Sequence, residues 1–340
     1  MSTFVSDPRA GGLPSGSQRG RRSSLRTWRW SDRLVLCAAW AAGLSLCAIA
    51  AAILLYMGYR GVQYLRPDLI FSRPQASLNQ AGSGGFLDPL LGTALLTVIG
   101  IAIAAPLAIS SALWIVEYGQ GGRAHQLLTR VVESSIEIVA GTPDIVIAVF
   151  GLAIFQLHLL AFASFIGEGG GVYGRSFLAA GAMMSLIALP PLFVATRDGL
   201  LAVPAHMREA AFALGKTRIA TIRRVLLPSV RPNIATGVTL GVSRIIADTA
   251  IVIVLLGDEL RLTPRQGGFP GLGVLRGTGS SLTSYVYDNS PAGEGLAPQK
   301  AYAAAVLLLV FVLLLNLAVE RFIRRSQART GGVAIAGGIA

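Results

Sequence analysis

Three side chains that are charged at neutral pH lie inside apolar segments that are long enough to cross a membrane. Arg244 and Asp248 fall within the run 232–256, and Asp144 falls within the run 138–162. A charged side chain at the centre of a bilayer costs about 3 kcal/mol or more, so such residues are candidates for a functional site. Residues four apart share one face of a helix, so we expect Arg244 to pair with Asp248. Asp144 is a second possible partner for Arg244.

The guanidinium of Arg244 is suited to binding a tetrahedral oxyanion, because its planar fork of N–H donors matches that geometry. Paired loosely with an acid, it would stay partly neutralised when no anion is bound. Thr249 could donate a hydroxyl, whereas the charge of Asp144 makes it a poor direct ligand for an anion. We place Arg244, Asp248, Thr249 and Asp144 on a candidate translocation pathway. The alternative is a buried structural pair that fixes helix register or joins two subunits.

Elsewhere the sequence has no arrangement typical of a catalytic centre. His125, His158 and His206 are scattered and lack the spacing of metal ligands. The sequence Gly215-Lys216-Thr217 resembles the end of a phosphate-binding Walker loop. However, Ala210 stands where that loop needs its first glycine, and no strand is predicted before it. We expect no metal site, no catalytic residue and no ATP bound by this chain.

A basic hairpin at about 205–228 separates two of the apolar segments. It contains Glu209-Ala210-Ala211-Phe212-Ala213-Leu214-Gly215, and nine residues later Val225-Leu226-Leu227-Pro228. The alanines favour helix, and their small side chains allow a partner to approach closely. We expect Glu209 in the first turn of this helix and Gly215 as its left-handed stop.

A second helix is predicted over Lys216–Leu227, with its apolar residues at helical spacing on one face. These residues are Ile219, Ile222, Val225 and Leu226. Pro228 and Pro232 predict a kinked entry to the next apolar segment. The hairpin therefore has the composition of a docking surface. The alternative is a solvated basic loop whose only role is to fix topology.

The elements that position these residues are predicted to be membrane-spanning helices in an all-α fold. Hydrophobic residues make up 53% of the 340-residue chain and charged residues 14%, with a mean hydropathy of +0.62. Soluble domains carry roughly a quarter charged residues, and a spanning helix needs about 20 apolar ones. Six transmembrane helices are predicted, over the runs Leu34–Met57, 90–115, 138–162, 177–196, 232–256 and 302–319.

The positions of the cations predict the orientation of these helices. Twenty of the 29 Lys and Arg residues fall in the N-terminal tail, the C-terminal tail and alternate loops, including the hairpin. By the positive-inside rule, both termini and the hairpin are cytoplasmic. The net charge of +12 is explained by this bias, and no basic soluble domain supports a nucleic-acid partner.

The predicted organisation follows from these assignments. Residues 1–33 form a basic, disordered cytoplasmic tail that could rest on anionic lipid. The first transmembrane helix covers 34–58, and the core with five further helices covers 87–325. That core includes the hairpin at about 205–228. A second cytoplasmic tail covers 326–340.

The hairpin resembles the coupling loop of ABC importer permeases, which meets the ATP-hydrolysing subunit in that family. The residues that match at family spacing are Glu209, Ala210, Ala211, Gly215, Val225, Leu227 and Pro228. All of these except Val225 are assigned to the ATPase-coupling contact. The resemblance implies that Glu209–Gly215 couples ATP hydrolysis on a partner to translocation.

Over residues 87–325 the chain is similar to the A-type permease subunit of the bacterial phosphate ABC importer. The matching segments include Gly92-Thr93-Ala94-Leu95-Leu96, Glu117-Tyr118-Gly119, the Gly-x-Pro of Gly141 and Pro143, Thr236-Gly237, and Thr283-Ser284-Tyr285-Val286-Tyr287-Asp288-Asn289-Ser290-Pro291. This resemblance implies a type I ABC importer permease fold in the bacterial plasma membrane. It places Arg244 on an arginine of the family and Asp248 on the acid that follows it.

The family resemblance also implies the partners and the substrate. The expected partners are a second related permease, a dimer of ATP-binding subunits that holds ATP and Mg, and an extracytoplasmic phosphate-binding protein. The expected substrate is inorganic phosphate. Two departures from the family pattern, Asp144 for Ser and Asp248 for Glu, leave sulfate or molybdate as alternatives. A secondary transporter is a further alternative, but it would have an inverted repeat and no need for the hairpin.

Overall fold

The computed structural model describes residues 30–74, 85–119, 121–165, 172–257, 272–291, 293 and 297–335. All regular elements within these ranges are helices. Most of the predicted N-terminal tail, residues 1–29, lies outside the described residues, as do the last five residues of the predicted C-terminal tail. The expected all-α fold is confirmed for the described part of the chain.

The chain divides into two units, Met1–Leu55 and Tyr56–Ala340. The described part of the first unit is the beginning of helix α1, Trp30–Tyr64, which continues into the second unit. This helix contains the whole predicted run Leu34–Met57. Its segment Asp32–Tyr64 is long and apolar enough to cross a membrane.

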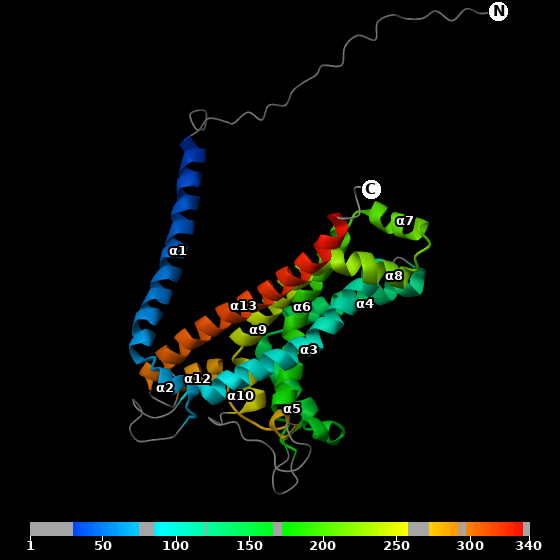
Figure 1. The fold of residues 1–340 in the computed structure, drawn as a ribbon. Coiled ribbons are helices and arrows are strands. Elements are labelled where there is room, and N and C mark those ends of the chain that lie inside the picture. The colour runs from blue at the N-terminus through cyan, green and yellow to red at the C-terminus, as the bar shows by residue number, and fades with distance from the viewer. Residues whose placement is uncertain are drawn as a thin grey trace, which may run out of the picture. The chain divides into compact units, whose positions relative to one another are not determined.

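The second unit holds the remaining elements (Figure 1). In chain order they are α2 (Pro67–Phe71), α3 (Leu87–Tyr118), α4 (Arg123–Gly141), α5 (Asp144–Phe155), η2 (His158–Ala163), α6 (Phe177–Ala202), α7 (Ala205–Ala213), α8 (Arg218–Thr221), η3 (Ile222–Leu226), α9 (Leu227–Ala247), α10 (Ala250–Leu256), α11 (Leu272–Leu275), α12 (Leu282–Asn289) and α13 (Pro298–Ile335). Here η2 is a 3-10 helix and η3 is a π-helical turn.

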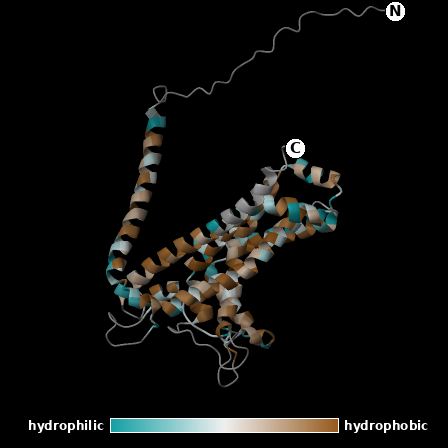
Figure 2. Ribbon diagram, viewed as in Figure 1, coloured by the Kyte–Doolittle hydropathy of each residue, from teal (hydrophilic) through white to brown (hydrophobic). Residues whose placement is uncertain are grey.

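Helices α3, α6 and α9 pack along one another, and α13 packs against α9. Helices α7 and α8 lie at one end of this bundle, while α2, α10 and α12 lie at the other (Figure 1). The C-terminal end of α13 lies at the same end as α7. Hydrophobic residues predominate along α3, α6 and α13, whereas hydrophilic ones gather at the end that carries α8 (Figure 2).

Four helices are individually long and apolar enough to span a membrane, namely α1, α3, α6 and α13. Two bent pairs, α4 with α5 and α8–α9 with α10, pass the same test together. The described helices thus provide six spans if each pair counts as one. This agrees with the six spans predicted from sequence, but two of the predicted helices are broken.

The predicted helix over 138–162 is wrong as a continuous element. Helix α4 ends at Gly141, and α5 begins at Asp144 after a bend of 109°. Thr142 has extended backbone (ψ 131°), as expected for a residue before proline. Pro143 also lacks the N–H that would continue the ladder. The break therefore puts Asp144 at the start of a new helix.

The predicted helix over 232–256 is likewise broken, with a bend of 62° between α9 and α10. By contrast, α6 runs without interruption through Pro190 and Pro191. Pro228 and Pro232 lie within one helical segment that extends from α8 through η3 to the end of α9.

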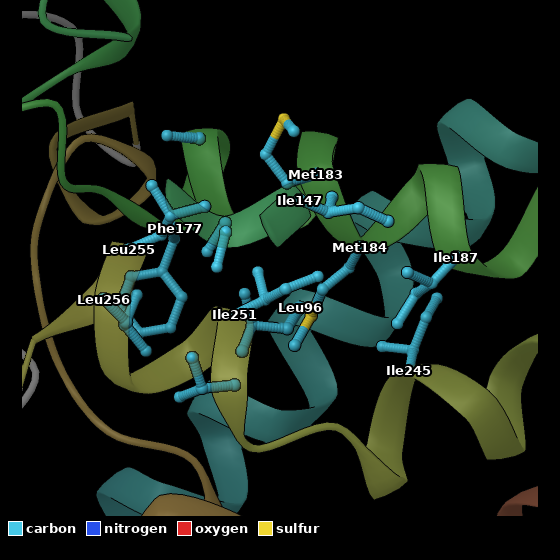
Figure 3. Packing of buried hydrophobic residues seen from close by; sticks show 14 of the residues in the cluster. Leu96, Ile147, Phe177, Met183, Met184, Ile187, Ile245, Ile251, Leu255 and Leu256 are labelled. Carbon is cyan, nitrogen blue, oxygen red and sulfur yellow. The ribbon is translucent and has the colours of Figure 1, made fainter. Parts of the chain in front are cut away.

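The main core joins α3, α5, α6, α9 and α10. Figure 3 shows its buried side chains, among them Leu96, Ile147, Met184, Ile245 and Leu255. A second cluster, nearer α7 and α8, includes Ile115, Leu192 and Leu226. Several glycines would place a Cβ atom 3.4 Å or less from a neighbouring helix, and four of them allow α3, α6 and α9 to approach closely. The contacts pair Gly100 with Ile245, Gly181 with Ile99, Gly237 with Leu192, and Gly241 with Ala188.

Candidate functional site

The first limb of the hairpin is the nine-residue helix α7, which ends in a Schellman motif. The N–H of Gly215 donates to the carbonyl of Phe212 at 2.9 Å, and that of Lys216 donates to Ala211 at 3.1 Å. Gly215 has a φ of +72°, a conformation that glycine adopts at little cost. The predicted stop at Gly215 is confirmed. The placement of Glu209 in the first turn is wrong, because the helix begins four residues earlier.

The predicted coupling residues divide between exposed and buried positions. Glu209, Ala210 and Gly215 are exposed, whereas Ala211 is buried. Two large apolar side chains on the same limb are also exposed, Phe212 at 44% and Leu214 at 78%. An exposed apolar pair on a polar, basic segment is the composition expected of a contact surface for another protein.

The second limb begins with α8, whose N-cap Thr217 accepts a hydrogen bond from the N–H of Ala220 at 3.3 Å. The π-helical turn η3 then leads directly into α9. A π turn has an i→i+5 hydrogen-bonding pattern, so it shifts the faces of the helix relative to an α-helical spacing. As a result Leu226 is fully buried but Ile219 is 61% exposed, which corrects the single apolar face predicted for this limb. Leu227 and Pro228 are half-buried at the start of α9.

Arg208 connects α7 to two other helices. Its Nε donates to Oε1 of Glu117, near the end of α3, at 3.0 Å. Its Nη1 and Nη2 donate to the carbonyls of Val203 and Leu200, both at 2.8 Å, and so satisfy backbone acceptors at the end of α6. The Arg208 and Glu117 side chains are 21% and 7% exposed. Sequence reasoning counted Arg208 only as a topogenic charge.

The residue after Glu117 contacts the other limb of the hairpin. The guanidinium carbon of Arg218, the first residue of α8, lies 4.9 Å from the centre of the Tyr118 ring. This distance is within the range of a cation–π interaction. Glu117 and Tyr118 were noticed in the sequence as part of a matching segment, but no role followed from their types alone.

On the membrane-spanning helices, Arg244 pairs with Asp144. The Nη2–Oδ1 distance is 3.4 Å, and the two side chains are 54% and 32% exposed. The expected pairing of Arg244 with Asp248 is wrong, because α9 ends at Ala247 and the helical spacing does not continue to Asp248. The break between α4 and α5 instead brings Asp144 to Arg244.

Asp248 and Thr249 occupy the break between α9 and α10. The Asp248 carboxylate is buried and accepts a hydrogen bond from the N–H of Ile251 at 2.8 Å, as a capping residue does. Thr283, at the start of α12, donates to the backbone carbonyl of Asp248 at 3.1 Å. The Asp248 carboxylate thus accepts a backbone N–H bond at the start of α10. The guanidinium of Arg244, by contrast, remains exposed.

The start of α12, which contacts the break between α9 and α10, is also hydrogen-bonded to α3. The N–H of Leu282 donates to the hydroxyl of Thr93 at 2.9 Å. Gly92 makes this approach possible, because a Cβ atom there would overlap the carbonyl oxygen of Ser280. Two of the segments that carried the family resemblance therefore meet at the end of the bundle opposite the hairpin (Figure 1).

With this geometry established, comparison with known proteins identifies the class. Residues 106–331 match the family described as "Binding-protein-dependent transport system inner membrane component". The match covers more than half of the chain, and the chain belongs to this family. It is a permease subunit of an ABC importer, a multi-pass membrane protein with the type I importer permease fold.

Named relatives narrow the comparison further. The chain is 29% identical over 249 residues, 73% of each chain, to the "Phosphate transport system permease protein PstA 1" of Mycobacterium tuberculosis. It is 26% identical over 294 residues to the "Phosphate transport system permease protein PstC" of Xylella fastidiosa, covering 83% of this chain and 84% of that one.

A solved structure of a bacterial alginate ABC transporter, in complex with an alginate pentasaccharide-bound periplasmic protein, supports the fold. The likeness has a TM-score of 0.60 at 16% identity and covers 87% of this chain and 96% of that one. At that identity the likeness concerns the fold alone.

Proposed function

We propose that this chain is one of two permease subunits of an ATP-driven importer of inorganic phosphate in the bacterial plasma membrane. The observation that carries the proposal is the accessible guanidinium of Arg244 on a membrane-spanning helix, paired with Asp144 at 3.4 Å. Ionisable residues within membrane-spanning segments are rare and mark substrate or ion pathways, and this guanidinium is more than half exposed despite its pairing. The relatives named as phosphate transport permeases support the choice of anion.

Asp144 is a departure from the family pattern and a poor ligand for a fully ionised anion, but an acid beside Arg244 favours an oxyanion that still carries a proton. Inorganic phosphate still carries protons near neutral pH, whereas sulfate and molybdate are fully ionised. Phosphate can therefore accept hydrogen bonds from Arg244 and donate one to the carboxylate of Asp144, which repels an anion without a proton. A site that binds a hydroxyl group discriminates strongly against analogues that lack it. Thr249 and Asp248 complete the proposed pathway, with Asp248 holding the break between α9 and α10.

The hairpin is the proposed contact with the ATP-binding subunits, which hold ATP and Mg. Closure of their dimer displaces α7 through the exposed residues Glu209, Ala210 and Gly215 and the apolar side chains beside them. The displacement passes along the chain to α6 and, through Leu227 and Pro228, to α9. The pathway then opens outward to accept phosphate from an extracytoplasmic binding protein, and hydrolysis resets it inward. The two states must differ in their contacts at the hairpin for this coupling to work.

The partners follow from this mechanism. A second, related permease completes the pathway, and the ATP-binding dimer docks on the cytoplasmic side, where both termini of this chain also lie. The matched residues of the hairpin support the ATPase contact.

The test is uptake of labelled phosphate by the reconstituted complex of both permeases, the ATP-binding subunit and the binding protein, with and without ATP. Unlabelled phosphate, sulfate and molybdate serve as competitors. ATP-dependent uptake that only phosphate blocks is the expected result. Competition by sulfate or molybdate would assign another oxyanion to the same mechanism. Uptake without any dependence on ATP, in an intact complex, would refute the coupling role of the hairpin.

A further inference from the structure

Two adjacent residues at the end of α3 contact both limbs of the hairpin. Glu117 binds Arg208 of α7 at 3.0 Å, and Tyr118 lies 4.9 Å from the guanidinium carbon of Arg218 in α8. Glu117 and Arg208 are 91 positions apart in the chain. No covalent path therefore requires α3 to follow the hairpin. The α3 clamp, defined as Glu117 and Tyr118, connects the hairpin to α3 directly, beside the packing of α3 against α6 and α9.

The contact between Glu117 and Arg208 is tight and well shielded from water. All three guanidinium nitrogens of Arg208 have an acceptor, and the Glu117 side chain is only 7% exposed. Removing one partner of a buried charged pair leaves the other charge uncompensated, which strongly disfavours separation of the pair. The pair therefore resists any movement of α7 that does not also carry the end of α3.

A second ion pair in the same region shows how specific this arrangement is. Arg197 of α6 and Glu133 of α4 lie 3.2 Å apart, but their side chains are 39% and 28% exposed. That pair joins two helices of the bundle, and its described ion pair involves neither limb of the hairpin. It offers the same chemistry, at a similar distance, without the proposed connection.

We propose that Glu117 and Tyr118 are positioning residues that transmit displacement of the hairpin to α3. This inference rests on the proposed function of the chain as an ATP-coupled permease. The covalent chain links α7 to α6, and α8 to α9. The α3 clamp connects the hairpin directly to the third helix of the packed set, in addition to the packing of α3 along α6 and α9, so that the end of α3 follows the hairpin when it moves.

The test compares Glu117→Gln with Glu133→Gln in the reconstituted complex. Both substitutions remove one carboxylate charge, but only the first weakens the α3 clamp. We measure assembly with the ATP-binding subunit, ATP hydrolysis, phosphate uptake and the KM for phosphate. For Glu117→Gln we expect intact assembly, continued hydrolysis and an unchanged KM. The phosphate transported per ATP should fall roughly tenfold, within the usual range for coupling between two sites. Glu133→Gln should match the wild type.

A second matched pair tests the other half of the α3 clamp. Tyr118→Phe keeps an aromatic ring beneath Arg218 and should keep most of the coupling, whereas Tyr118→Leu removes the ring and should lower the phosphate-to-ATP ratio. A purely structural role would instead reduce assembly, and it would leave the ratio unchanged in the complexes that do form.

The outcomes separate this inference from the proposed function. A wild-type complex without ATP-driven phosphate uptake would overturn the proposed function and this inference with it. If the wild type is active but Glu117→Gln and Tyr118→Leu have the wild-type ratio, only the α3 clamp is overturned. Loss of assembly in both variants would also overturn it, in favour of a structural role. If Glu117→Gln alone fails to assemble, the phosphate-to-ATP ratio of Tyr118→Leu decides: a lowered ratio supports the α3 clamp, and a wild-type ratio overturns it.

Discussion

Replacing Asp144 by asparagine tests whether the acid beside Arg244 selects for a protonated anion. At 3.4 Å and an effective dielectric constant of about 20, the Coulomb attraction between these charges would be about 5 kcal/mol. The two side chains are 54% and 32% exposed, however. Water in the proposed pathway screens such a pair, and its contribution falls to about 1 kcal/mol. Asp144→Asn removes this competing attraction, so the free energy of anion binding to Arg244 should become more favourable by about 1 kcal/mol, or roughly fivefold in affinity.

The gain should differ between anions. For sulfate, the substitution removes both the competition of the Asp144 carboxylate for Arg244 and its repulsion of the anion. The inhibition constant of sulfate against phosphate uptake should therefore fall about fivefold or more. Phosphate should change less, because the amide oxygen still accepts a hydrogen bond but no longer attracts its proton as strongly. The assay is ATP-driven uptake of labelled phosphate by the reconstituted complex, with sulfate as the competitor.

The matched control is Glu133→Gln, since the pair of Glu133 with Arg197 has similar distance and exposure but lies off the proposed pathway. This control should leave the inhibition by sulfate unchanged. An Asp144→Asn complex with wild-type phosphate uptake and wild-type inhibition by sulfate would refute the selective role of Asp144.

Three further predictions concern the pathway, the hairpin and the packing. Arg244→Gln should abolish uptake, because the anion loses its charged hydrogen-bond donor, while the purified complex stays assembled. Loss of assembly would instead indicate that Arg244 has a structural role. Gly215→Ala should reduce ATP-coupled uptake, since a φ of +72° costs a non-glycine residue about 1 kcal/mol or more. Gly215→Asn should reduce uptake less, because asparagine tolerates this conformation. Equal uptake by the wild type and Gly215→Ala would contradict the role of Gly215 as the helix stop. Gly92→Ala should lower the melting temperature of the detergent-solubilised protein, because its methyl group would overlap the carbonyl of Ser280 and overpacking costs about 1–3 kcal/mol. The control Gly58→Ala has open space around its Cβ position, and similar melting of the two variants would argue against that contact.

The elements were largely predictable because lipid imposes a strong length requirement on spanning helices. Five of the six apolar runs fall on a helix or a bent pair, and the run 138–162 covers the end of α4, all of α5 and most of η2. Gly215 could be identified because few residues adopt its conformation. The two breaks were harder to predict. Pro143 interrupts one span, yet Pro190 and Pro191 lie inside a continuous helix, so the presence of a proline did not distinguish the cases.

The connections between the elements were less predictable than the elements themselves. A spacing of four suggested that Arg244 pairs with Asp248, but that inference assumed an unbroken helix. The actual partner, Asp144, is 100 positions away in the chain. The contact of Arg208 with Glu117 is similarly remote, and single-sequence patterns carry no information about such pairings. Both contacts depend on how the helices pack.

The glycine contacts among α3, α6 and α9 have a consequence for how this chain can diverge. At Gly100, Gly181 and Gly237 a Cβ atom would lie 3.0 Å or less from a neighbouring helix, so a larger side chain needs its neighbours to shift; at Gly241 a Cβ atom is already in contact, and side chains larger than alanine meet the same limit. Such positions are closed to gradual substitution, because each intermediate sequence would have to tolerate the overlap. Outward-facing positions of the same helices need only remain apolar and can drift freely. We expect relatives that share only about a quarter to a third of their residues to retain small residues at these four positions, and an alignment of distant members would check this.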